Sequence, residues 1–116
     1  MTNQTKSSKV LYYKTGQTII ERGEHTYEAY IIEKGSVEVR INDKLLAILK
    51  DKEIFGEIGW LGHIPRTATV TALEDVTLMV LKEEQAKLYM QHNPSALIPI
   101  LKIVVERMSE MLKNFK

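Results

Sequence analysis

The residues best placed to do chemistry lie between Phe55 and Val70, in the segment F-G-E-I-G-W-L-G-H-I-P-R-T-A-T-V. One carboxylate, Glu57, precedes one guanidinium, Arg66, by nine residues. Glycines let backbone N–H groups approach a ligand closely, and an arginine fork matches the oxygens of a phosphate. An ionised carboxylate only accepts hydrogen bonds, so Glu57 should meet hydroxyls. The segment therefore predicts a site for a small ligand that carries a phosphate and a sugar hydroxyl.

The start of this segment favours a phosphate cradle built from the backbone. Gly56 and Gly59 fall where a short helix should begin, and glycine in a first helical turn is unfavourable by up to ~1 kcal/mol relative to alanine. Both could simply be turn residues, but a close approach to a ligand explains them better. The candidate phosphate and sugar donors are the backbone N–H groups of Gly56, Glu57, Ile58 and Gly59.

Turn signals divide residues 10–81 into short stretches with strand alternation. Val37, Val39 and Ile41, for example, alternate with charged or polar residues. Short strands at regular spacing are typical of an antiparallel sandwich or barrel. The count fits a mainly β fold, an eight-stranded jelly-roll barrel.

After Leu81 the pattern becomes helical and predicts two C-terminal helices. Residues 82–92 form the first, which Asn93-Pro94 ends, and Ser95 can cap a second that runs through Lys116. The apolar residues of the second helix recur every three or four positions: Leu101, Val104, Met108, Met111 and Phe115, with Val105 and Leu112 beside them. This face is wider than packing on one sheet requires, so we expect part of it to cover a ligand, another subunit or a missing segment.

The length of 116 residues fits one domain. The polar residues 1–9 predict an N-terminal tail, and residues 10–116 the domain, with a β-roll over about 10–81 and helices over about 82–116. The tail lacks the apolar core of a signal peptide, and no run of eighteen apolar residues predicts a membrane span. Because the chain has no cysteine for a disulfide framework, we expect a cytoplasmic protein.

Composition and motifs argue against nucleic-acid binding and catalysis. The formal net charge is +1, without a basic stripe, so this chain alone is not expected to bind nucleic acid. His25, His63 and His92 lack the spacing of metal ligands, and the chain shows neither a serine-nucleophile motif nor a Walker-type loop. We interpret the chain as a sensor rather than an enzyme, with no metal or cofactor.

Segment 55–70 resembles the phosphate-binding cassette of the cyclic nucleotide-binding domain family. That family includes catabolite activator protein, the regulatory subunits of protein kinases A and G, and cyclic nucleotide-gated channels. Its cassette runs F-G-E, a short apolar helix, then often P-R, a small residue and V. Residues 10–24 resemble the family's opening strands and residues 30–40 its next hairpin. With the C-terminal helices, the resemblance covers nearly the whole chain and implies the family's double-stranded β-helix fold.

The resemblance also implies roles for individual residues. The arginine that matches Arg66 holds the exocyclic oxygens of a cyclic phosphate, and the carboxylate that matches Glu57 accepts from the ribose 2′-hydroxyl. At the position of Thr67, family members that have alanine tend to prefer cAMP. A hydroxyl at this position can bond the phosphate or a guanine amino group. Both cAMP and cGMP therefore remain open as ligands. By the family's layout, the lid or base-facing residues are Met111, Leu112 and Phe115.

Our first hypothesis is a free-standing receptor for cAMP or cGMP whose C-terminal helix moves on binding and which regulates an unidentified effector protein. A homodimer through that helix is left open. The alternative hypothesis is a protein-interaction module on the same fold, which binds a partner or another nucleotide such as cyclic di-GMP. A piece of a larger regulator is a third reading, although the start at Met1 favours a complete small protein.

Overall fold

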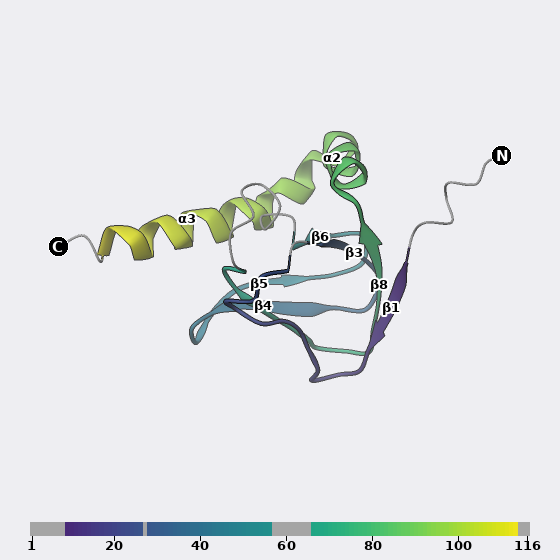
Figure 1. The fold of residues 1–116 in the computed structure, drawn as a ribbon, viewed down its shortest axis with the longest axis horizontal. Helices are drawn as coiled ribbons and strands as arrows, with labels where there is room; N and C mark the ends of the chain where they lie inside the picture. The colour runs from purple at the N-terminus through teal and green to yellow at the C-terminus, as the bar shows by residue number, and fades with distance from the viewer. Residues whose placement is uncertain (1–8, 27, 57–65, 114–116) are drawn as a thin grey trace.

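The computed structural model describes residues 9–26, 28–56 and 66–113. Within these residues, eight strands form two antiparallel four-stranded sheets (Figure 1). The strands are β1 (Val10–Tyr13), β2 (Thr18–Ile20), β3 (Ala29–Lys34), β4 (Val37–Ile41), β5 (Lys44–Leu49), β6 (Ile54–Phe55), β7 (Thr69–Ala72) and β8 (Val76–Leu81). One sheet has the order β1-β8-β3-β6 and the other the order β2-β7-β4-β5. The chain passes from one sheet to the other between most consecutive strands, which confirms the predicted jelly roll.

The two sheets face each other across the main hydrophobic core. Val39 on β4 pairs with Val70 on β7, and both side chains are buried. In the other sheet, Ile32 on β3 pairs with Leu78 on β8, and both are completely buried. Because side chains alternate between the faces of a strand, each of these strands contributes one row to the core and one to the outside. Burying such a side chain contributes about 1.5–3 kcal/mol, so these rows fix the register of the strands.

Two helices follow the β-roll, as predicted, with a short turn between them. They are α2 (Glu83–His92) and α3 (Leu97–Lys113), and the 3₁₀ turn η2 (Pro94–Ala96) joins them. Ser95 lies inside η2, so the prediction that it caps the second helix directly was wrong. Pro99 is tolerated because it is the third residue of α3, where a backbone N–H has no partner within the helix.

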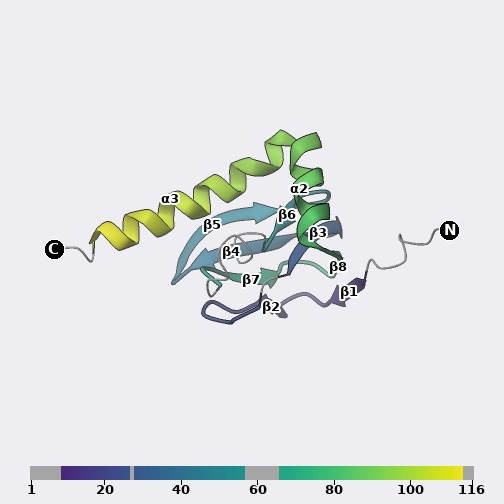
Figure 2. The ribbon, with the colours of Figure 1, turned by 45° about the horizontal axis from the view of Figure 1, so that its top comes forward.

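The helices attach to the roll through a second, smaller cluster. Ala86 of α2 is fully buried against Ala29 and Ile54, and Val104 of α3 packs against the same cluster. From there α3 passes along β5 and its C-terminal end projects beyond the sheets (Figures 1 and 2). Of the helices in the described ranges, none is long and apolar enough to cross a membrane.

Candidate ligand-binding site

Arg66 is the centre of the predicted site, and its side chain is turned into the protein with only 5% exposed. Among the described residues, its guanidinium donates hydrogen bonds to three acceptors. Nε donates to the Thr26 hydroxyl at 2.9 Å, Nη1 to the Gly56 carbonyl at 2.6 Å and Nη2 to the Glu28 carbonyl at 2.8 Å. These acceptors come from the connection between β2 and β3 and from the end of β6, so Arg66 joins three distant parts of the chain.

Backbone hydrogen bonds hold Arg66 in this position. The Gly23 N–H donates to the Arg66 carbonyl, and the Arg66 N–H donates to the Glu24 carbonyl, each at 2.8 Å. They lie beyond the Ile20–Val70 pair of the β2–β7 ladder and tie the β2–β3 connection to the entry of β7. These bonds fix the backbone from which the Arg66 side chain extends, so the orientation of the guanidinium does not depend on the side chain alone.

Gly56 is required by its backbone and by its neighbours. Its φ is +86°, in the left-handed region that favours glycine. A Cβ on this residue would lie 2.7 Å from the Glu28 carbonyl oxygen and 3.2 Å from Arg66 Nη1. The structure thus gives Gly56 a role that the sequence did not reveal, because its carbonyl accepts from Arg66. Its predicted role as an N–H donor to a ligand stays a prediction.

Tyr30 forms the apolar wall behind Gly56. Its ring packs on Phe55 with 5.3 Å between centroids, and its hydroxyl donates to the Glu28 carboxylate at 3.1 Å. Burial, and then the negative charge of Glu28, raise the pKa of the Tyr30 hydroxyl well above its ordinary value. The hydroxyl therefore stays protonated and remains a donor at neutral pH, which keeps Glu28 in place beside Arg66.

Arg66 brings a positive charge to the cluster. An arginine side chain is always charged at neutral pH, and a buried charge is costly unless other groups compensate it. The three acceptors described above are a hydroxyl and two carbonyls, which are all neutral. These three acceptors bring no negative charge of their own to the guanidinium, and an arginine fork suits the oxygens of a phosphate.

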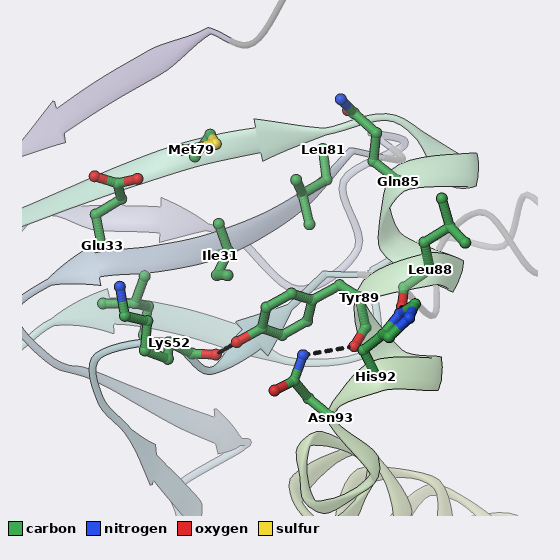
Figure 3. Close-up of a pocket in the computed structure, with 11 residues that line it drawn as sticks. Ile31, Glu33, Lys52, Met79, Leu81, Gln85, Leu88, Tyr89, His92 and Asn93 are labelled. Atoms are coloured by element: carbon green, nitrogen blue, oxygen red, sulfur yellow. Dashed lines mark hydrogen bonds between the residues drawn. The ribbon is translucent and has the colours of Figure 1, made fainter. Parts of the chain in front are cut away.

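A separate groove of about 410 Å³ lies between α2 and the outer faces of β3 and β8 (Figure 3). Tyr89 projects into it from α2 and its hydroxyl donates to the Lys52 carbonyl, while the Asn93 side chain donates to the Tyr89 carbonyl. Burial raises the pKa of Tyr89, so its hydroxyl stays a donor. None of the described residues that line this groove is a predicted ligand residue. The contacts anchor α2 to the turn between β5 and β6.

The family model of the cyclic nucleotide-binding domain matches residues 10–93, which include the whole β-roll, Arg66 and α2. The chain belongs to this family. The match confirms the family that the cassette predicted and agrees with the jelly-roll fold. The cluster around Arg66 lies within the matched residues, and its role as the ligand site stays a prediction.

Named relatives agree with this assignment. The domain is 39% identical over 75 residues to the cAMP-dependent protein kinase regulatory subunit of Debaryomyces hansenii, which covers 64% of this chain and 16% of that protein. It is 34% identical over 70 residues to the cGMP-dependent protein kinase of Plasmodium berghei, which covers 60% of this chain and 8% of that protein. The chain therefore spans less than a fifth of either relative.

A solved structure shows the same fold. It is described as Sp-2Cl-cAMPS bound to PKAR CBD2 and superposes with a TM-score of 0.67 at 24% identity. The superposition covers 93% of this chain and 71% of that one. The similarity includes the C-terminal helices as well as the β-roll, because so little of the chain is left out.

The structure locates some predicted site residues of the cyclic nucleotide-binding domain and not others. It brings Gly56 and Arg66 together, and it places the half-buried Thr67 directly after Arg66, at the entry to β7. Glu57, Ile58 and Gly59 lie outside the described residues, as do Phe115 and the side chain of Met111. Leu112 is 67% exposed. The lid role of the last three residues stays a prediction.

Sequence reasoning missed Thr26 and Glu28. Glu28 holds Arg66 through its backbone carbonyl, which any residue type offers. Thr26 lies 40 residues before Arg66, in a stretch that reads as an ordinary polar turn. No local signal in the chain could have identified either contact.

Proposed function

We propose that this domain binds cAMP or cGMP, with the cyclic phosphate at Arg66, and that it regulates an effector protein through α3. The observation that carries the proposal is the buried Arg66 guanidinium, which donates to acceptors from two other segments of the chain inside a cyclic nucleotide-binding fold. In this proposal Glu57 accepts from the ribose 2′-hydroxyl. The backbone N–H groups at the start of the cassette, from Gly56 to Gly59, donate to the phosphate and the sugar.

A calorimetric titration tests the proposal. We expect the purified protein to bind cAMP or cGMP and to bind cyclic di-GMP at least tenfold more weakly. We also expect 2′-deoxy-cAMP to bind more weakly than cAMP, because Glu57 would lose its hydroxyl partner. Equal affinity for cAMP and for its deoxy analogue would contradict the proposed contact between Glu57 and the ribose 2′-hydroxyl. No heat with any of these nucleotides would favour the protein-interaction module in place of the receptor.

The choice between cAMP and cGMP is tested at Thr67. We expect Thr67→Ala to reduce affinity for cGMP more than affinity for cAMP, by roughly 1 kcal/mol, because one hydrogen bond to the guanine is lost. The measurement is a pair of titrations on the parent and on the variant. Equal losses for both nucleotides would mean that the Thr67 hydroxyl contacts only the phosphate. The proposal would then name no residue that recognises guanine.

We propose that α3 transmits the binding event. A ligand shifts a conformational equilibrium only through different contacts with the two states. Contacts between described residues hold α3 on the roll, and two of them are specific. Lys44 of β5 forms a 2.9 Å salt bridge to Glu106, and Val104 packs against the second cluster. Movement of the cassette beside Ile54 and Gly56 would change the surface on which Val104 rests, and so the position of α3.

The same helix offers a surface for a second copy of the chain. A row of side chains on α3, here called the α3 seam, is between 56% and 67% exposed: Ile98, Leu101, Val105, Met108 and Leu112. Their spacing alternates between three and four residues, which is the heptad pattern of a coiled coil. One core position of this repeat holds Ile98, Val105 and Leu112 and the other holds Leu101 and Met108, and β-branched residues at the first with leucine at the second favour two helices in a parallel coiled coil. We therefore propose that the domain forms a homodimer through the α3 seam.

Truncation after Arg107 separates a dimer seam from a lid. It removes Met108, Leu112 and the residues beyond but keeps Val104 and Glu106, so the helix stays attached to the roll. We expect sedimentation to show a shift from dimer to monomer, with nucleotide binding retained. A fall in affinity at constant mass would identify the removed part as a lid instead.

A matched pair of point variants sharpens this test. Met108→Glu places a charge within the α3 seam, and Ser109→Glu makes the same change in charge one position away. We expect only the first to shift the mass toward the monomer. Dimers of equal stability for both variants would contradict the seam.

A further inference from the structure

Thr26 lies at the boundary between solvent and the buried guanidinium. The residue is exposed on the connection between β2 and β3, yet its hydroxyl reaches inward and accepts from Arg66 Nε at 2.9 Å. An exposed threonine in a loop has no need of such a partner, because water can satisfy its hydroxyl. The contact therefore serves the arginine, whose buried N–H groups need acceptors.

The position of this bond on the guanidinium decides what it does. Nε and Nη2 share one edge of the planar fork, and on this edge Thr26 accepts from Nε while the Glu28 carbonyl accepts from Nη2. Two acceptors on one edge fix the plane of the fork as well as its place. Loss of the Thr26 acceptor would leave Nε without this partner and would remove one of the contacts that fix the plane of the fork, while Nη1 and Nη2 keep the Gly56 and Glu28 carbonyls.

The chemistry of a hydroxyl suits this task. A carboxylate in the same place would pair with the guanidinium and compete with an anionic ligand for its charge. A hydroxyl accepts the Nε–H bond without bringing a negative charge to the guanidinium. We propose that Thr26 is a positioning residue of the site, which holds the Arg66 fork in the orientation that a cyclic phosphate meets. This proposal rests on the proposed function of the domain.

The affinity test compares two variants of Thr26 with a control. Thr26→Val keeps the shape and removes the hydroxyl, and we expect it to weaken cAMP or cGMP binding by about tenfold. Thr26→Ser keeps the hydroxyl and should restore binding to within about threefold of the parent. Thr77→Val, a like change on the outer face of β8, should leave affinity unchanged. Unchanged affinity in Thr26→Val, or equal losses in the valine and serine variants, would overturn the proposal.

Hydrogen exchange at Arg66 provides a readout that does not require nucleotide. In the nucleotide-free protein the Nε–H resonance of Arg66 should exchange slowly, and Thr26→Val should speed its exchange at least tenfold, whereas Thr26→Ser should not. Exchange as slow in Thr26→Val as in the parent would overturn the positioning role. A parent protein that binds neither nucleotide would instead overturn the proposed function, so the two failures are distinguishable.

Discussion

Arg66→Ala should weaken cyclic nucleotide binding by about 2–4 kcal/mol, the largest loss that we expect from a single substitution. The variant removes the charged fork that would bond the phosphate in a desolvated site. It also leaves the carbonyls of Gly56 and Glu28 without the donors that they have in this structure. Titration calorimetry with the nucleotide that the parent binds measures the loss.

A second arginine gives the control for this prediction. Arg40 lies on β4, where it bonds Glu38 and the Asp43 carbonyl, away from the candidate site. Arg40→Ala removes the same charge and should leave affinity unchanged. Circular dichroism should show that both variants remain folded. Affinity within twofold of the parent in Arg66→Ala would contradict the assignment of the cassette.

Gly56→Ala should destabilise the fold and disturb the site together. The new Cβ would lie 2.7 Å from the Glu28 carbonyl oxygen, on a residue whose φ is +86°. Left-handed backbone costs a residue with a Cβ about 1–2 kcal/mol, and the contact with Glu28 adds to this. We expect urea denaturation to show a loss of about 2–3 kcal/mol in the free energy of unfolding, and calorimetry to show weaker nucleotide binding.

Gly16 separates the two causes. Its φ is +89°, almost the same as that of Gly56, but a Cβ there would meet nothing within 4 Å. Gly16→Ala should therefore show only the backbone cost, about 1–2 kcal/mol, with nucleotide affinity unchanged. The contrary result is that Gly16→Ala and Gly56→Ala lower the free energy of unfolding equally and leave nucleotide affinity unchanged. That result would show that the crowding of Gly56 against Glu28 and Arg66 does not contribute to stability or to binding.

The sequence by itself determined the class of fold and the place of the cassette. Alternation on β4 sent Val37, Val39 and Ile41 to the core and left the residues between them half-buried on the other face, because side chains on a strand have a period of two. Asn93-Pro94 marked the end of α2, since the residue before proline avoids helical backbone. Such signals are local, and the residues that carry them lie within a few positions of the structure that they specify.

The division of the apolar face of α3 was decided by tertiary structure. The sequence placed Leu101, Val104 and Met108 on one broad face, because all recur at helical spacing. The structure packs Val104 against the roll and leaves Leu101 and Met108 exposed. A helical repeat says which side chains share a face, but the angle at which the helix meets the sheet decides which of them is buried.

The environment of Arg66 also could not be predicted from the sequence. The cassette motif identified the arginine, but not the inward turn of its side chain or the partners that hold it there. Among the described residues, those partners include the Thr26 hydroxyl and the carbonyls of Glu28 and Gly56, which the pairing of β2 with β7 and of β3 with β6 brings to one place. A backbone carbonyl has no residue type by which to recognise it, and a contact across 40 positions follows only from the register of the strands between.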